Sequence, residues 1–193
     1  MRNKDNTEMK KSRSAERELA QRQDIYEWIQ SIIAALMICV LLFVFGIRII
    51  DVSGSSMNPT LFNGDKLIVS KLFYEPKVGD IVIFKTDSYD PDKALVKRII
   101  ATEGQVINID FDNGIIYIDN EPIEEDYIKE LTKNKLDFIG PKTVPENCVF
   151  VMGDNRNAST DSRDSRIGMV DKRLIIGKAY CVVYPLSNLG WVE

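Results

Sequence analysis

The chain has 193 residues and a formal net charge of -4, and it contains no histidine. This length suits one domain of about 150 residues together with an anchor segment, and two large domains do not fit. The acidic balance disfavours nucleic-acid binding. The absence of histidine excludes Ser-His-Asp and Cys-His mechanisms and most catalytic zinc sites, so a hydrolase built from this chain must use another base.

The N-terminal part of the chain divides into a polar tail and an apolar run. Residues 1–24 are polar and carry an excess of basic residues: Lys10, Lys11, Arg13, Arg17 and Arg22. Residues 28–47 follow without a charge, and at helical rise they are long enough to cross a hydrocarbon core about 30 Å thick. We therefore predict a cytoplasmic tail over 1–24 and a transmembrane anchor helix over 25–50, with residues 51–193 outside the cell membrane.

Two other interpretations of the apolar run are a cleaved signal peptide and the buried helix of a soluble domain. The apolar region of a signal peptide has about 7 to 15 residues and ends in small residues. This run is longer and leads into Arg48, Ile49 and Ile50. A permanent anchor is therefore favoured, with Tyr26 and Trp28 in an interfacial aromatic belt.

Residues 51–193 are predicted to form a mainly β domain, because short β-rich runs alternate with Gly, Pro, Asn and Asp. The expected strands are Lys66–Lys71, Asp80–Lys85, Ala94–Ala101, Gln105–Phe111, Ile115–Asp119, Cys148–Met152 and Ile175–Tyr184. Asn113 and Gly114 predict a tight hairpin turn, since Asn-Gly tolerates positive φ angles. Residues 121–144 are more polar and weakly patterned, and we expect them to form an excursion from the β body.

The three cysteines, Cys39, Cys148 and Cys181, have neither CxxC spacing nor the density of a disulfide scaffold. They are expected to be small buried residues. A disulfide between Cys148 and Cys181 is left open, because oxidising conditions prevail outside the cytoplasm.

Three segments contain residues that can carry chemistry. Ser56 lies in the Gly- and Pro-containing connection 51–65, Lys97 lies in an apolar strand, and polar residues fill the segment 153–166. Taken singly, the serine is typical of a hydrogen-bonding cap, the lysine of a solvated strand residue, and the polar segment of an elaborate turn. None of them alone establishes an active site.

Together, and in this order, the segments resemble the type I signal peptidase family. GSSMNPTL (54–61) is similar to the family's nucleophile box, GDIVIFK (79–85) to a strand box, VKR (96–98) to the lysine box, and GDNRNASTDSR (153–163) to the final signature. The resemblance extends from about residue 28 onward. It implies a mainly β, signal-peptidase-like catalytic domain preceded by a single transmembrane helix, in the compact form of the Gram-positive enzymes.

The resemblance implies a serine/lysine dyad, in which Ser56 is the nucleophile and Lys97 the general base. A lysine ordinarily titrates at about pH 10.4, so it acts as a base only where burial makes its charge unfavourable. Nearby apolar residues are expected to provide this setting and to bind substrate: Met57, Leu95 and Val96.

Supporting residues are also implied by the resemblance. Ser159 is expected to orient Lys97 by a hydrogen bond. A supporting salt-bridge cluster is expected from Arg98, Asp161 and Arg163.

Asp154 and Asn155 are expected to form a turn near the site. Gly54 stands where one branch of the family has a serine that donates to the oxyanion hole. The expected donors are therefore the backbone N–H of Ser56 and a backbone N–H near Gly54.

The resemblance implies signal-peptide-bearing preproteins as substrates, cleaved after small residues while bound in extended form along a strand edge. The lipid bilayer is a second expected partner, contacted by apolar residues: Leu61, Phe62, Leu72 and Phe73. The secretion machinery is a further candidate partner. No cofactor or metal is expected, because the sequence has no histidine, CxxC pair or Gly-rich phosphate loop.

Two rival functions are considered. A self-cleaving, repressor-like serine/lysine protease shares the dyad, but the predicted anchor argues against it. A catalytically inactive, membrane-tethered β domain that binds peptides would use Ser56 and Lys97 only as structural residues. Replacing Ser56 with Ala and assaying a preprotein separates this second rival from the enzyme.

Overall fold

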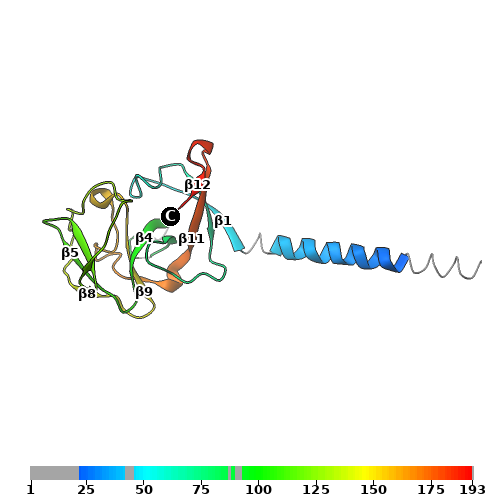
Figure 1. Ribbon diagram of the computed structural model, residues 1–193, viewed down its shortest axis with the longest axis horizontal. Helices are drawn as coiled ribbons and strands as arrows, with labels where there is room; N and C mark the ends of the chain where they lie inside the picture. Colours follow the sequence, from blue (N-terminus) through cyan, green and yellow to red (C-terminus); the bar gives the residue numbers. More distant parts are fainter. Residues whose placement is uncertain (1–21, 42–45, 87, 90–92, 193) are drawn as a thin grey trace, which may run out of the picture. The chain divides into compact units, whose positions relative to one another are not determined.

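The computed structural model describes residues 22–41, 46–86, 88–89 and 93–192. The chain divides into two compact units, residues 1–45 and 46–193. An apolar helix forms the described part of the first unit, and strands dominate the second (Figure 1). The predicted fold class, mainly β with one N-terminal apolar helix, is confirmed.

The helix of the first unit runs from Arg22 to Leu41 and is long and apolar enough, by length and composition, to cross a membrane. Its described part includes residues 22–24 of the predicted tail, 1–24. The predicted anchor helix, 25–50, is wrong at its end, because Ile47–Asp51 forms the strand β1. The apolar residues of β1 continue the composition of the preceding run, so composition alone does not separate the strand from the helix.

The second unit is built around an eight-stranded antiparallel sheet. Its strands are β1 (Ile47–Asp51), β2 (Lys66–Ser70), β3 (Ile81–Phe84), β4 (Leu95–Thr102), β9 (Cys148–Met152), β10 (Val170–Asp171), β11 (Ile175–Tyr184) and β12 (Gly190–Trp191). They follow the order β1-β2-β11-β3-β4-β9-β10, and β12 pairs with β11. The long strand β11 therefore joins the N-terminal pair, β1 and β2, to the strands β3 and β4.

A smaller antiparallel sheet has four strands, in the order β7-β6-β5-β8. They are β5 (Val106–Asp110), β6 (Ile115–Ile118), β7 (Glu121–Pro122) and β8 (Lys142–Thr143). Within the second unit, β5 and β8 lie at the opposite end from β11 and β12 (Figure 1). Short 3₁₀ turns complete the unit: Arg156–Ala158, Lys172–Leu174 and Leu186–Asn188.

The turn between β5 and β6 lies where the sequence predicts it. Only Gly114 takes a positive φ there, at 76°. The carboxylate of Asp110 accepts hydrogen bonds from the backbone N–H groups of Asp112 and Asn113, at 2.9 and 3.0 Å. This carboxylate closes the turn, so Asn113 does not need the left-handed conformation that an Asn-Gly turn suggests.

All seven strands predicted from the sequence are present, and each agrees with its predicted bounds to within one residue. The sequence analysis misses β1 and the two-residue strands β7, β8, β10 and β12. Residues 121–144 contain β7 and β8 and are otherwise irregular, as predicted for an excursion from the β body.

Three buried apolar clusters hold the second unit together. Strand β3 separates two of them: Ile81 and Ile83 pack with Met57 in one cluster, and Val82 and Phe84 belong to another. Because successive strand residues point to opposite faces, β3 is buried on both sides. The third cluster combines residues of β5 and β6 with residues of β4 and β9, and so joins the two sheets.

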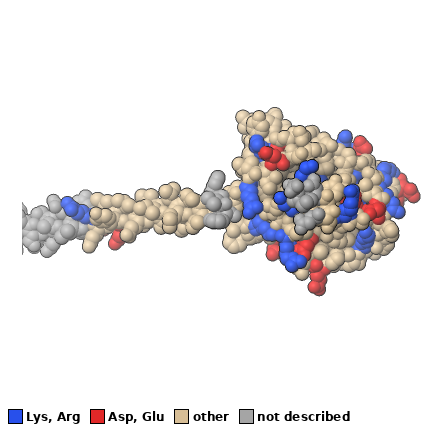
Figure 2. All heavy atoms as spheres, turned by 180° about the vertical axis from the view of Figure 1, so that it is seen from behind, with Lys and Arg blue, Asp and Glu red and all other residues tan. Residues whose placement is uncertain are grey.

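Charged side chains of both signs are scattered over the face of the second unit that Figure 2 shows, among a larger area of other residues. Three of the four apolar residues expected to meet a bilayer are exposed: Phe62, Leu72 and Phe73. Phe73 is 97% exposed. The fourth prediction is wrong, because Leu61 is fully buried in the same cluster as Met57.

The three cysteines are free thiols, so Cys148 and Cys181 do not form a disulfide in this structure. Cys39 is exposed on the helix of the first unit, and the other two are partly buried. The expectation that all three are buried is therefore wrong.

Candidate active site

The loop that carries Ser56 connects β1 to β2 and is closed at its neck. The N–H of Val52 donates to the carbonyl of Asp65 at 2.8 Å, and the N–H of Gly64 donates to the carbonyl of Val52 at 2.9 Å. Within the loop, Met57 and Leu61 are buried in the apolar cluster against the large sheet. These two side chains anchor the loop, and Ser56, directly before Met57, stays partly exposed.

Lys97 lies on β4 and points its amine at this loop. The side chain is 3% exposed, and its Nζ is hydrogen-bonded to Ser56 Oγ at 2.7 Å. A second hydrogen bond joins Nζ to the carbonyl of Val96 at 2.9 Å. The structure thus brings together the two residues predicted to form the dyad, although they lie in different segments.

The environment of Lys97 favours its neutral form. Burial lowers the pKa of the amine from the usual 10.5 to about 8. The carboxylates of Asp161 and Asp154 oppose this change, whereas the guanidinium of Arg163 adds to it. Desolvation is the largest cause, so a substantial neutral fraction, able to accept a proton, exists at mildly alkaline pH.

The carboxylate of Asp154 connects the lysine strand to the serine loop. It accepts hydrogen bonds from Arg98 Nε at 3.0 Å, from Arg98 Nη2 at 2.8 Å and from Thr60 Oγ1 at 2.5 Å. Arg98 directly follows Lys97, and Thr60 lies four residues after Ser56. Asp154, expected only to form a turn, therefore holds the two sides of the dyad together.

The expected salt-bridge cluster forms as two separate buried pairs. Arg98 pairs with Asp154, and Arg163 pairs with Asp161 through Nε–Oδ1 at 2.8 Å and Nη2–Oδ2 at 2.9 Å. The prediction of one cluster of Arg98 with Asp161 and Arg163 is wrong in this detail. Arg98 pairs with the first carboxylate of the polar segment, Asp154, because this is the one that lies against β4.

Two residues of the polar segment contact the main chain of the serine loop at Ser55 and Ser56. The N–H of Asn155 donates to the carbonyl of Ser56 at 3.0 Å, and its side-chain amide donates to the carbonyl of Ser55 at 3.0 Å. A Cβ added to Gly153 would lie 2.4 Å from the Ser56 carbonyl oxygen and 2.3 Å from Ser159 Oγ. Only a glycine fits at position 153. The contacts of Gly153 and Asn155 with the main chain of Ser56 are not predicted from the sequence.

Comparison with known proteins identifies the family of this chain. The sequence model of the family described as signal peptidase, peptidase S26, matches residues 25–184. The chain belongs to this signal peptidase family. The predicted enzyme class, a serine endopeptidase of the type I signal peptidase kind, is confirmed.

Similar relatives come from cyanobacteria and bacilli. A probable signal peptidase I-1 of Synechocystis sp. is 38% identical over 177 residues, which cover 87% of this chain and 87% of the relative. A signal peptidase I of Bacillus licheniformis is 35% identical over 185 residues, covering 90% and 96%. Signal peptidase I S of Bacillus subtilis is 33% identical over 184 residues, covering 89% and 95%.

Ser159 does not make the hydrogen bond that the family resemblance implies. Its Oγ is buried and has no hydrogen-bond partner among the described residues. The bonds of Lys97 Nζ go to Ser56 and Val96 instead. Ser159 is nevertheless next to the nucleophile's main chain, because both lie against Gly153.

The backbone near Gly54 offers less to an oxyanion than expected. The N–H of Gly54 already donates to Asn63 Oδ1 at 2.9 Å, and this residue holds the loop with a φ of 92°. The Ser56 N–H, by contrast, donates no hydrogen bond to any described residue. It is the better placed of the two predicted donors.

The predicted substrate-binding residues differ in accessibility. Met57 and Val96 are 1% and 8% exposed and belong to the apolar core. Their side chains therefore pack beneath the site and are not accessible to a substrate. Leu95, at the start of β4, is partly exposed. Of the three, Leu95 is the one whose side chain can meet a peptide without a rearrangement.

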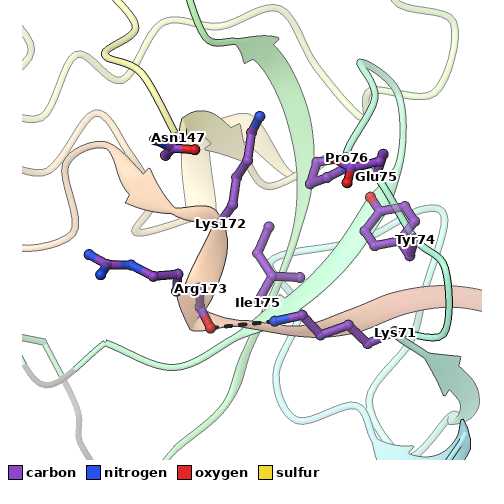
Figure 3. Close-up of a pocket in the computed structure, with 8 residues that line it drawn as sticks. All are labelled: Lys71, Tyr74, Glu75, Pro76, Asn147, Lys172, Arg173 and Ile175. Carbon is purple, nitrogen blue, oxygen red and sulfur yellow. Dashed lines mark hydrogen bonds between the residues drawn. The ribbon is translucent and has the colours of Figure 1, made fainter.

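A cavity of about 310 Å³ lies elsewhere on the second unit and shares no residue with the dyad (Figure 3). Its lining residues are Lys71, Tyr74, Glu75, Pro76, Asn147, Lys172, Arg173 and Ile175. The cations there are already engaged, Lys172 with Glu103, Arg173 with Asp171, and Lys71 with the Arg173 carbonyl at 3.5 Å. The dyad therefore remains the candidate active site.

We predict that Gly153→Ala lowers peptidase activity by about tenfold or more, because the added methyl group displaces the Ser56 carbonyl and small displacements of a nucleophile are costly. Cleavage rates of the full chain measure this effect. Gly190→Ala is the control, since a Cβ added there meets only the Asn188 carbonyl oxygen, at 4.0 Å. A folded Gly153→Ala variant that cleaves at the wild-type rate would contradict the prediction.

Proposed function

We propose that the chain is a membrane-anchored serine endopeptidase that removes N-terminal signal peptides from exported preproteins, with Ser56 as nucleophile and Lys97 as general base. The observation that carries this proposal is the 2.7 Å contact between Ser56 Oγ and a buried lysine amine of lowered pKa. The relatives' name, signal peptidase I, supports the substrate class.

In the proposed reaction, the neutral amine of Lys97 accepts the proton of Ser56 Oγ as this oxygen attacks the scissile carbonyl carbon. The carbonyl oxygen becomes an oxyanion, which the Ser56 N–H stabilises. The tetrahedral intermediate then collapses: the peptide C–N bond breaks, and the ammonium of Lys97 gives its proton to the leaving amine. Lys97 then takes a proton from a water molecule as its oxygen attacks the acyl carbon. The ester C–O bond to Ser56 breaks, the cleaved chain leaves as a carboxylic acid, and the ammonium of Lys97 returns the proton to Ser56 Oγ.

The edge of β4 supports binding of an extended peptide beside the dyad. Strand β9 pairs with β4 only from Arg98 to Thr102, whereas β3 pairs with β4 from Leu95 to Arg98. Among the described strands, the side of β4 toward β9 is therefore unpaired over 95–97. A substrate strand added at this edge would place its scissile bond near Ser56 and a small side chain near Leu95.

The helix 22–41 supports a membrane anchor with the N-terminus in the cytoplasm. The basic excess of residues 1–24 favours the cytoplasmic side of a membrane, and Trp28 suits its interface. The exposed side chains of Phe62, Leu72 and Phe73 add apolar surface that can contact lipid. The catalytic unit would then lie outside the membrane, where preproteins emerge from the secretion machinery.

Two substitutions test the dyad. Ser56→Ala removes the nucleophile, and Lys97→Arg keeps a positive charge but replaces the base with a guanidinium that stays protonated. Each should lower the cleavage of a preprotein by about a thousandfold or more. Lys66→Arg is the control, because Lys66 is an exposed lysine paired with Asp51 outside the dyad. A Lys97→Arg variant that cleaves at a near wild-type rate would refute the proposed base.

Cleavage should depend on pH through the amine of Lys97. The active form is the neutral one, so kcat/KM should fall by about tenfold per pH unit below the pKa and level off above it. Because burial lowers this pKa to about 8, the decline in kcat/KM should be measurable between pH 8 and pH 6. Rates from pH 6 to 10, with circular dichroism to verify folding, provide the test. A flat profile would exclude a titrating lysine base.

The topology is tested by adding protease to intact spheroplasts. Cleavage should occur after Asp51, in the catalytic unit, and should spare residues 1–24, because only the former lies outside the membrane. Lysed spheroplasts serve as the control, since both segments are then accessible. Attack on the tail of intact cells, with the catalytic unit protected, would reverse the proposed orientation.

A further inference from the structure

The excursion over residues 121–144 has no role in the mechanism so far, yet it meets the polar segment through a buried ion pair. Arg156 is 0% exposed, and its Nη1 and Nη2 donate to the two carboxylate oxygens of Glu125 at 2.9 and 2.5 Å. Nη1 also donates to Thr132 Oγ1 at 3.1 Å, and Nε donates to the carbonyl of Gly153 at 3.1 Å. The guanidinium therefore connects the excursion directly to Gly153.

Tyr127 extends this contact to the strand that carries the lysine. Its hydroxyl donates to Glu125 Oε1 at 3.0 Å, and its ring centroid lies 4.0 Å from Arg98 Cζ and 5.9 Å from Arg156 Cζ. A cation over a ring face is attracted electrostatically, more strongly when it is removed from water. One aromatic ring thus lies close to both arginines, Arg156 of the Glu125 pair and Arg98, which follows Lys97.

These contacts form a closed path around the polar segment. Glu125 binds Arg156, and Arg156 binds the Gly153 carbonyl. The next residue, Asp154, binds Arg98, whose guanidinium lies against the ring of Tyr127. The hydroxyl of Tyr127 donates to Glu125, which closes the path. A further hydrogen bond from the N–H of residue 129 to the Asp154 carbonyl, 3.1 Å long, fixes the excursion to the same turn.

The end of this path lies against the nucleophile. Gly153 is in contact distance of the Ser56 carbonyl, and Asn155 donates to that same carbonyl. Any shift of the Gly153–Asn155 turn therefore moves the main chain of Ser56 relative to Lys97. The position of the turn is set on one side by Arg98 and on the other by Arg156.

A purely stabilising role explains this arrangement less well. Replacing a buried ion pair by packed apolar side chains is often neutral or favourable for stability, so stability alone does not call for Glu125 and Arg156. What the pair provides is direction, because a planar guanidinium binds a carboxylate and a carbonyl in one fixed geometry.

We propose that Glu125 and Arg156, together with Tyr127, are positioning residues that set the distance between Ser56 Oγ and Lys97 Nζ through the Gly153–Asn155 turn. This inference rests on the proposed function, since it assigns these residues to the efficiency of the same dyad.

The test measures kcat and KM of the full chain with a peptide that carries a signal-peptide cleavage site. Glu125→Gln keeps the shape of the side chain but removes the charge partner of Arg156. It should lower kcat by about tenfold or more and leave KM within about twofold, because the dyad is misplaced while the β4 edge is unchanged. The control is Glu103→Gln, which removes the exposed pair with Lys172 and should leave both constants unchanged.

Three further variants keep the test decisive if Glu125→Gln does not fold. Thr132→Val removes one hydrogen bond to Arg156, and Tyr127→Leu removes the aromatic ring; both should lower kcat. Tyr127→Phe keeps the ring and should therefore retain more activity than Tyr127→Leu. Activities are compared well below each variant's unfolding midpoint, so that a loss of folded protein does not contribute.

The outcomes separate the two proposals. If the wild type cleaves the peptide and Ser56→Ala does not, the proposed function stands. Folded variants at Glu125, Tyr127 and Thr132 with wild-type kcat would then overturn the positioning role alone, as would a change confined to KM. If the wild type itself does not cleave, the proposed function fails and the positioning role fails with it.

Discussion

Lys97 must keep its amine out of water and 2.7 Å from a hydroxyl that lies 41 residues earlier in the chain. Burial is what makes this contact useful, because it lowers the pKa of the amine to about 8 and so leaves a lone pair available near the serine. A lysine on a solvated strand would stay protonated at neutral pH and serve only as a charge. The strand order, the apolar clusters and the polar segment together hold Lys97 Nζ beside Ser56 Oγ.

Consecutive residues of the polar segment hold the contact from two directions. Asp154 binds Arg98 on the lysine strand and Thr60 on the serine loop, and Asn155 binds the carbonyl of Ser56 itself. Their hydrogen bonds exist before any substrate arrives, so the two reacting groups need not be ordered again during the reaction. Such preorganisation is the main means by which a site of few residues gains rate.

The sequence predicts the strands of the second unit well, because β-rich runs separated by turn residues are a local signal. It fails at β1, whose isoleucines continue an apolar run, and at strands of two residues, which are too short to show a period of two. The anchor's end was therefore placed too late, and the small edge strands were not seen.

For the site, the family motifs identify the residues but not their partners. The segment 153–163 holds two aspartates and two arginines besides Arg98 from β4, and which carboxylate meets which guanidinium depends on the path of the backbone. Thr60 and Glu125 carry no local signal, since each acquires its role through a contact with a distant segment. Ser159 is the opposite case. The motif predicts a hydrogen bond from Ser159 to Lys97, but Ser159 Oγ has no hydrogen-bond partner among the described residues.

Holding a lysine in a site that prefers it neutral has an energetic cost that other residues must offset. A pKa lowered from 10.5 to about 8 corresponds to a cost of about 3 kcal/mol, which applies in full below pH 8 and declines as the pH rises toward 10.5. The buried ion pairs are not the source of the compensation, because their attraction is largely cancelled by desolvation. Met57 and Leu61 are a better source, since full burial of such side chains contributes about 1.5–3 kcal/mol each. Both belong to the loop that presents Ser56, so the same burial that offsets the cost of the buried amine also holds the Ser56 hydroxyl beside Lys97.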